Sequence, residues 1–415
     1  MKIGFFGLSH LGLNYLAANA FKGHKVIGYD RDNYLIKDLT SGKKLFKEPF
    51  LFENINRYKK NIKFTNNLKD LKKCKIVFIS SDVKTDSIGK SNLKFIKKDI
   101  NSLKKNLFNK NLIIMSQVNP GFTKKIVWNN NKLFYQVETL VFGDAFKRAL
   151  NPERIILGTH NPLKKINKDL KNLYSKFNCS IIKTDYNTAE FIKISINLYL
   201  ISSITTTNLI SKIVKKIGGC WSDIENSLRL DKRIGKFAYL KPGLGISGGN
   251  LERDLHNITD LAKQKTVSTK LFKIWRENSL HQKNWAYSIF RENLKKTKKS
   301  TAGVLGLAYK ENTDSLKNSP AIHLINRLKN KNIYVFDPVV KKIMKKKDVI
   351  YANTVNELIS KIDILFIMTP WKIFKNIDIN LLSNSKIKMI IDPYGILISQ
   401  KTNLEIKNIK YFSLT

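Results

Sequence analysis

The sequence predicts an α/β protein in which two doubly wound, Rossmann-like domains are joined by a long central helix and a helical middle domain. Two observations support this prediction. Short apolar runs alternate with helical stretches in the first part of the chain and again in its last third, as in parallel sheets covered by helices. A long stretch with helical periodicity separates the two series. We therefore expect domains over residues 1–186, 187–298 and 299–415, with the lysine-rich stretch 295–299 at the second boundary.

The composition fits a folded protein without a membrane span. The chain has 415 residues, of which 42% are hydrophobic, and this excludes a disordered or collagen-like chain. No run of about 18 uncharged apolar residues occurs, so we expect no transmembrane helix. The three cysteines lie far apart without metal-type spacing, which predicts a reduced, cytoplasmic protein and no metal site.

The formal net charge is high, at +43, and raises the question of nucleic-acid binding. The lysines are spread along the whole chain, however, with no basic tail and no recognisable nucleic-acid-binding motif. A solvated lysine surface is the simpler interpretation, and we expect no nucleic-acid partner. Anionic small molecules are the other class of partner that this charge suits.

The first strand, turn and helix carry the pattern of a dinucleotide site. The apolar run 3–6 leads into a glycine turn and a helix, and a second strand over 25–29 is followed by an acid, about 20 residues after the turn. In such a site the first glycine makes the tight turn and the helix N-terminus receives the pyrophosphate. The acid binds the ribose hydroxyls, which favours NAD over NADP. The candidate residues are Gly7, Ser9, Leu11, Gly12 and Asp30.

Two positions in this part of the chain leave alternatives open. Ser9 stands where a glycine would let the backbone approach the phosphates, so its Cβ would weaken or displace the cofactor, and an ordinary strand–helix connection is the alternative. Further strands are expected over 76–80, 112–116 and 181–184. Ser116 ends one of them at the carboxyl edge, where open sheets bind ligands, and a simple Pro-Gly turn is the alternative there.

The middle segment is expected to begin with a long helix. Asn187 is the expected N-cap, with Glu190 reaching back to it, and the apolar periodicity continues to Gly218. Lys193 and Asn197 are four residues apart and therefore share a face. In isolation, the ordinary interpretation of the two is a solvated lysine and a surface amide.

The loop over residues 242–250 is the densest glycine stretch of the chain. Such a loop lets the backbone close around a phosphate or a sugar. A flexible linker is the alternative, but the bulky Leu244 and Ile246 between the glycines argue against it.

As a whole, the sequence resembles the UDP-glucose/GDP-mannose dehydrogenases almost from end to end. The resemblance rests on many motifs that occur in the family's order. They are the N-terminal dinucleotide turn, Gly42 with Glu48-Pro49, Ser116 with Pro120-Gly121, residues 151–158, Ala189-Glu190 with Lys193 and Asn197, residues 231–235, the glycine loop continued to Asp254, residues 306–310, 312–314 and 319–321, Asp337-Pro338, and residues 369–371 with Phe374.

The resemblance implies an NAD-dependent oxidation of a nucleotide sugar and a homodimer built on the central helix. In the family, the primary alcohol at the sixth carbon of the sugar becomes a carboxylate in two hydride transfers. By motif, Lys193 would stabilise the developing alkoxide, and Asn197 and Asp254 would position a water. Glu138 would handle the proton or the hydrolytic water.

The resemblance also implies contacts to the ligands. Arg233 would reach the ligand of the neighbouring subunit, and Lys317 would take the place of a cofactor-binding arginine. The other implied substrate residues are Lys241, Gly243, Gly245 and Lys310.

The departures from the family lie at the chemistry. Asn250 stands where the family has the cysteine whose thiolate captures the aldehyde, and an amide nitrogen is not a nucleophile. The motif around Glu138 lacks the family's arginine and second glutamate, a Thr-Pro pair after residue 80 is absent, and Gln117 and Tyr394 replace a threonine and an arginine. We therefore expect an oxidoreductase with altered chemistry, such as a single two-electron oxidation. A non-catalytic relative that binds a nucleotide sugar is the alternative.

Overall fold

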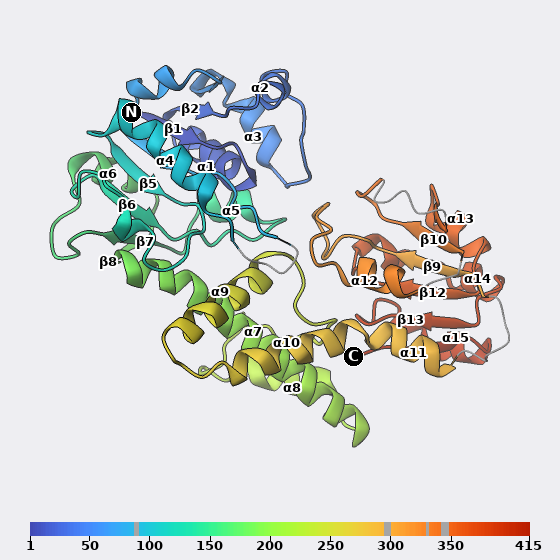
Figure 1. Cartoon of the computed structure of the whole chain (residues 1–415). Coiled ribbons are helices and arrows are strands. Elements are labelled where there is room, and N and C mark those ends of the chain that lie inside the picture. The colour runs from blue at the N-terminus through green and yellow to red at the C-terminus, as the bar shows by residue number, and fades with distance from the viewer. Residues whose placement is uncertain (87–90, 294–299, 329–331, 342–347) are drawn as a thin grey trace. The chain divides into compact units, whose positions relative to one another are not determined.

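An eight-stranded sheet is the framework of the first of two units, Met1–Ile196 (Figure 1). Its strand order is β3-β2-β1-β4-β5-β6-β7-β8, and neighbouring strands are parallel except for the antiparallel pair β6–β7. The computed structural model describes residues 1–86, 91–293, 300–328, 332–341 and 348–415. The strands of this sheet are β1 (Lys2–Phe6), β2 (Lys25–Tyr29), β3 (Ile62–Thr65), β4 (Ile76–Ile79), β5 (Asn111–Ile114), β6 (Leu133–Gln136), β7 (Arg154–Thr159) and β8 (Ser180–Asp185).

Helices cover both faces of this sheet. Successive side chains of β1 point to opposite faces, so Phe5 packs in one core with helix α1 (His10–Phe21) and Phe6 packs in the other with α4 (Lys94–Leu107). The strand order changes direction between β1 and β4, where open parallel sheets bind ligands. The other helices of this unit are α2 (Asn33–Thr40), α3 (Leu51–Arg57), α5 (Ala145–Leu150) and α6 (Lys168–Tyr174).

The long helix α7 (Tyr186–Lys216) follows β8 directly and continues into the second unit. The prediction of Asn187 as its N-cap, with Glu190 reaching back, is wrong. Asp185 has the capping role instead, because the strand runs straight into the helix and the last strand residue faces the first turn. Its Oδ1 accepts the Thr188 N–H (3.1 Å) and its Oδ2 accepts the Thr188 hydroxyl (2.5 Å). The Tyr186 hydroxyl donates to the Leu133 carbonyl at the start of β6 (2.9 Å).

The second unit, Asn197–Thr415, contains the rest of α7, eight further helices and a six-stranded sheet, as far as the structure describes it. The strand order is β11-β10-β9-β12-β13-β14, and all pairs are parallel. The expected boundary at 295–299 lies outside the described residues. The elements are α8 (Trp221–Leu230), α9 (Asn250–Gln264), α10 (Lys270–Lys283), α11 (Trp285–Asn293), β9 (Ala302–Leu305), α12 (Pro320–Arg327), β10 (Ile333–Phe336), β11 (Val349–Tyr351), α13 (Val355–Ser360), β12 (Ile364–Ile367), α14 (Ile379–Ser383), β13 (Met389–Ile391), α15 (Lys401–Ile406) and β14 (Lys410–Phe412).

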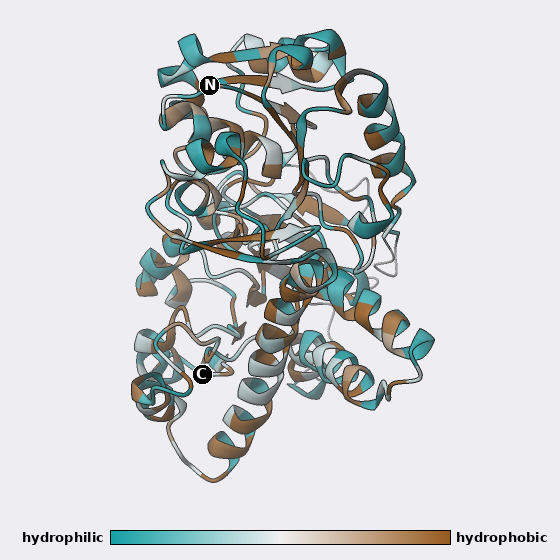
Figure 2. Ribbon diagram, turned by 90° about the vertical axis from the view of Figure 1, so that its left-hand side faces the viewer, coloured by the Kyte–Doolittle hydropathy of each residue, from teal (hydrophilic) through white to brown (hydrophobic). Residues whose placement is uncertain are grey.

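The predicted α/β class with two helix-covered parallel sheets is confirmed. Figure 2 shows the helices striped with hydrophilic and hydrophobic residues, as expected for helices with one exposed and one buried face. Among the described residues, no helix is long and apolar enough to cross a membrane. The same residues contain no group of three or more His, Cys, Asp or Glu side chains placed to hold a metal ion.

Candidate active site

The turn between β1 and α1 requires glycine at two positions. Gly7 has a φ of 94°, and a Cβ on it would lie 2.3 Å from Ser81 Oγ. A Cβ on Gly12 would lie 2.1 Å from the Gly7 carbonyl oxygen, so α1 starts closer to the turn than any side chain allows. Ser9 is the N-cap of α1, and its hydroxyl donates to the Ser80 carbonyl (2.7 Å). The Ser9 hydroxyl is therefore engaged by the protein, at the end of β4.

Asp30 lies beside this turn, directly after β2. Its Oδ2 accepts the Leu8 N–H (2.9 Å), and its Oδ1 accepts the Asp32 N–H (3.1 Å). Each carboxylate oxygen has more than one lone pair, so Asp30 can accept further hydrogen bonds. The first N–H groups of α1, including that of the half-buried Leu11, have no acceptor within the helix. Helix N–H groups suit a pyrophosphate, and a carboxylate suits the hydroxyls of a ribose. The residues present therefore fit NAD.

The second sheet repeats this local geometry, but its carboxylate is buried. Gly306 follows β9 with a φ of 85°, and the Asp337 carboxylate after β10 accepts the Leu307 N–H (2.8 Å). Asp337 is buried, however, and also accepts N–H groups of Val339, Val340 and other residues. We conclude that Asp337 is a structural residue, whereas the half-exposed Asp30 is available to a ligand.

Ser116 lies at the end of β5, close to the same turn. Its side chain is buried, and its hydroxyl donates to the Ser81 carbonyl (2.6 Å). Ser116 thus ties the end of β5 to the end of β4, and a cofactor contact by its hydroxyl stays a prediction.

Lys193 and Glu138 form a buried ion pair in the first unit. Lys193 Nζ lies 2.9 Å from Glu138 Oε1, and the two side chains are 7% and 11% exposed. Glu138 Oε2 also accepts the Leu140 N–H (3.0 Å). Lys193 is therefore not the solvated lysine that the helix pattern indicated in isolation. A buried ammonium beside a carboxylate can stabilise an alkoxide and take part in proton transfer.

Glu190 links α7 by hydrogen bonds to the connection that follows β5. Its carboxylate is fully buried and accepts the N–H groups of Gly121 (2.6 Å) and Thr123 (2.8 Å). Burial raises the pKa of Glu190, and the hydrogen bonds from this connection oppose that rise. Because Glu190 lies one turn before Lys193, these bonds fix the helix close to the ion pair.

In the second unit, Asn197, Asp254, Arg253 and Asn250 form a hydrogen-bonded group. Asn197 Nδ2 donates to Asp254 Oδ2, and the two residues are 5% and 0% exposed, so Asn197 is not a surface amide. Arg253 Nε lies 3.5 Å from Asp254 Oδ1, and Arg253 Nη2 donates to Asn250 Oδ1 (3.1 Å). The structure thus brings together three of the predicted catalytic residues.

The glycine loop before α9 has a fixed shape and is not a flexible linker. Asn208 Oδ1 accepts the Gly243 N–H (2.8 Å), and Ser279 Oγ accepts the Ile246 N–H (2.8 Å). Gly245 has a φ of 79°, and a Cβ on it would lie 2.7 Å from the Ser279 carbonyl oxygen. The predicted substrate residues Gly243 and Gly245 therefore present backbone in a rigid arrangement.

Two predicted lysines lie at this loop. The Lys317 side chain packs on Gly249, where a Cβ would be 2.5 Å from Lys317 Cδ. Lys310 Nζ lies 5.8 Å from the centre of the Tyr309 ring, and that ring packs on Gly248.

The two other predicted cations are placed differently. Lys241 is exposed at the start of the loop. Arg233 is also exposed and pairs with Asp231 of its own turn (2.6 Å), so the described residues bring it to no other member of the site.

Sequence reasoning missed two cations of this part of the fold. Arg253 was detectable, because Asn250, Arg253 and Asp254 occur within one helical turn. Lys283 is 8% exposed and donates to Asn318 Oδ1, and Asn318 in turn donates to the Ile246 carbonyl (3.2 Å). Burial lowers the pKa of Lys283. Nothing in the sequence distinguishes this lysine from the many others.

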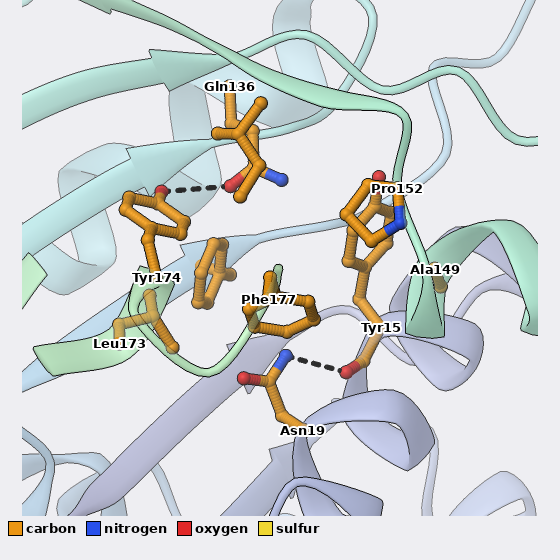
Figure 3. A pocket seen from close by; sticks show the side chains of 10 residues that line it. Tyr15, Asn19, Gln136, Ala149, Pro152, Leu173, Tyr174 and Phe177 are labelled. Atoms are coloured by element: carbon orange, nitrogen blue, oxygen red, sulfur yellow. Dashed lines mark hydrogen bonds between the residues drawn. The ribbon is translucent and has the colours of Figure 1, made fainter. Parts of the chain in front are cut away.

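A small pocket in the core of the first unit is not part of the site (Figure 3). The Tyr174 hydroxyl donates to Gln136 Oε1 (2.9 Å), and Asn19 donates to the Tyr15 carbonyl (2.8 Å). Burial raises the pKa of both tyrosines. The pocket has room for about one water molecule and is too small for a nicotinamide or a sugar.

Comparison with known proteins identifies the family. Models of the UDP-glucose/GDP-mannose dehydrogenase family match in chain order: the NAD binding domain over residues 1–178, the central domain over 187–279 and the UDP binding domain over 303–399. A UDP-glucose 6-dehydrogenase from Rickettsia prowazekii is 30% identical over 377 residues, which cover 84% of this chain and 85% of that protein. The chain belongs to the UDP-glucose/GDP-mannose dehydrogenase family.

Solved structures agree with the fold of a UDP-glucose/GDP-mannose dehydrogenase. A UDP-glucose dehydrogenase from Pyrobaculum islandicum has a TM-score of 0.88 at 20% identity and covers 100% of this chain and 97% of its own. A UDP-D-ManNAc dehydrogenase from Pyrococcus horikoshii has a TM-score of 0.83 at 23% identity, with 95% and 96% covered.

Membership of this dehydrogenase family confirms the predicted resemblance and the nucleotide-sugar oxidoreductase class. The NAD binding domain confirms NAD as the cofactor. The three-domain boundaries, the roles of single residues, the dimer and the cytoplasmic location stay predictions.

Proposed function

We propose that the chain oxidises a primary alcohol of a nucleotide sugar with NAD and stops at the aldehyde. The observation that carries this proposal is the contrast between two groups of residues. The Lys193–Glu138 pair and the Asn197–Asp254 hydrogen bond are both present and buried, whereas Asn250 offers no nucleophile. Lys193 and Asn197 stand one turn apart on the continuous helix α7.

The first oxidation needs a base and a cation at the alcohol oxygen. The Lys193 ammonium stabilises the developing alkoxide, and the Glu138 carboxylate accepts the alcohol proton. NAD, when bound, accepts the hydride from the same carbon, so that the alcohol loses two electrons and becomes an aldehyde.

The second oxidation of the family requires a covalent adduct at the aldehyde carbon. Arginine donates hydrogen bonds and accepts none, so Arg253 holds the oxygen of the Asn250 amide and turns its NH₂ group the other way. Asn250 therefore presents a hydrogen-bond donor where the family presents a thiolate. A donor can bind the aldehyde oxygen but cannot form a thiohemiacetal.

The test is the number of NADH molecules formed per sugar consumed. The panel should contain UDP-glucose, UDP-D-ManNAc and GDP-mannose, because relatives of this fold carry names with different sugars. We expect about one NADH per sugar and an aldehyde product that hydroxylamine traps. Two NADH per sugar would overturn the proposal. No turnover with any sugar, together with saturable NAD binding, would favour the non-catalytic alternative. The neutral Tyr394 ring beside Gly243 also favours that alternative, because the family has an arginine at this position.

We further propose that a second copy of the chain covers the exposed stripe of α7. Leu209 and Ile213 on α7, and Ile217 directly after its end, are four residues apart and are 53%, 53% and 77% exposed, so they form one apolar row. Sedimentation equilibrium is expected to give twice the chain mass of 47.8 kDa. A particle of the single-chain mass at micromolar concentration would contradict the dimer.

A further inference from the structure

The end of β2 carries two side chains with opposite implications for the coenzyme. Asp30 suits the ribose hydroxyls of NAD, and the next residue, Arg31, is of the type that binds the 2′-phosphate of NADP. A guanidinium binds phosphate strongly because it donates two parallel hydrogen bonds. The position of the Arg31 guanidinium therefore bears directly on coenzyme choice.

The structure directs this guanidinium toward α4. Arg31 Nη2 lies 3.0 Å from Asp99 Oδ1, and the Asp99 side chain is 8% exposed. The second carboxylate oxygen of Asp99 accepts the Ser81 hydroxyl (3.2 Å). Ser81 itself contacts Gly7 of the dinucleotide turn. Asp99 is thus built into the wall of the cofactor site, although it lies 69 residues after Asp30 in the sequence.

The charged groups at this edge interact with one another. The carboxylates of Asp30 and Asp99 lie near the Arg31 guanidinium, and Lys98 adds a second positive charge. Burial raises the pKa of Asp99, Asp30 adds to the rise, and Arg31 and Ser81 oppose it, so the groups interact electrostatically. A 2′-phosphate at Asp30 would meet the Asp30 carboxylate and an arginine that already has a buried partner.

We infer that Asp99 is a specificity-determining residue that favours NAD by holding Arg31 away from the position of a 2′-phosphate. Asp99 acts through Arg31 and is therefore a positioning residue. Asparagine at position 99 keeps the shape and removes the charge, so Arg31 becomes available to a phosphate.

The experiment measures binding of adenosine ligands and needs no sugar turnover. Titration calorimetry with 5′-ADP and 2′,5′-ADP gives the preference of each variant for the 2′-phosphate. For Asp99→Asn we expect this preference to rise about tenfold, whereas binding of 5′-ADP changes little. In the double variant Asp99→Asn/Arg31→Ala we expect the gain to disappear. The matched control is Asp169→Asn, which removes a carboxylate paired with Lys75 elsewhere in the first unit.

Two results would overturn the inference. One is an unchanged preference in Asp99→Asn, and the other is a gain that persists after Arg31 is removed. A melting curve of each variant establishes that it is folded, and Asp99→Ser, which keeps a hydroxyl for Ser81, replaces an unfolded asparagine variant. Because the readout is binding, failure of the proposed sugar oxidation would leave this test intact.

Discussion

Replacing Lys193 by Met is expected to lower kcat/KM for the nucleotide sugar about 1,000-fold, with little change in NAD binding. The substitution removes the cation at the developing alkoxide, and removal of such a group typically costs about 100- to 1,000-fold in rate. It also leaves Glu138 buried without its partner, which we expect to lower the free energy of unfolding by about 3 kcal/mol. Steady-state kinetics and chemical denaturation measure the two effects.

A second substitution separates the chemical role of Lys193 from its structural one. In Lys193→Met/Glu138→Gln the buried carboxylate is absent, so most of the lost stability should return while activity stays low. Lys216→Met, at the exposed end of the same helix, is the control and should change neither quantity. Recovery of activity in the double variant would show that Lys193 acts through folding alone.

Replacing Asn250 by Cys is expected to raise the yield from about one to two NADH per sugar. The new thiol would lie in the first turn of α9 beside Arg253, and a helix N-terminus and a cation both lower a thiol pKa. Its thiolate would attack the aldehyde carbon, hydride transfer from that adduct to a second NAD would give a thioester, and water would release the carboxylate. The measurements are NADH yield and the mass of the product.

The controls for this substitution are chemical. Serine is similar in size to cysteine but has no thiol, so Asn250→Ser should stay at one NADH per sugar. Alkylation of Asn250→Cys with iodoacetamide should remove the second oxidation. If the cysteine variant carries a reactive thiol and still yields one NADH, Asn250 is not the position that decides the extent of oxidation.

Local features of this fold could be predicted from the sequence, and features that join distant segments could not. The strand, glycine turn, helix and acid around Gly7 and Asp30 lie within one stretch of about 30 residues, so their spacing determines their geometry. The same holds for the glycine loop, although its rigidity depends on Asn208 and Ser279 from other helices.

The candidate site depends on contacts that spacing does not encode. Periodicity alone leaves Lys193 as a solvated residue, because its partner Glu138 comes from a different strand connection. The predicted cap at Asn187 is wrong for a related reason, since Asp185 at the end of β8 accepts the Thr188 N–H and the helix already begins at Tyr186. Family motifs pointed to Lys193 and Glu138, but they gave no indication of Arg253 or of the Arg31–Asp99 pair.

The reversed strand β7 has a consequence for the direction of α7. Because β7 and β8 run opposite to β6, α7 begins at the amino edge of the sheet, where Tyr186 bonds to Leu133 at the start of β6. Two helical turns, about 10 Å, then bring Lys193 to Glu138 just beyond the end of β6. With all strands parallel, α7 would leave from the carboxyl edge and carry its lysine away from the turn between β1 and α1. The carboxyl edge of a parallel sheet usually receives its functional side chains from loops. Here one change of strand direction places a residue from the middle of a helix at that edge, and the backbone of that residue is hydrogen-bonded within the helix.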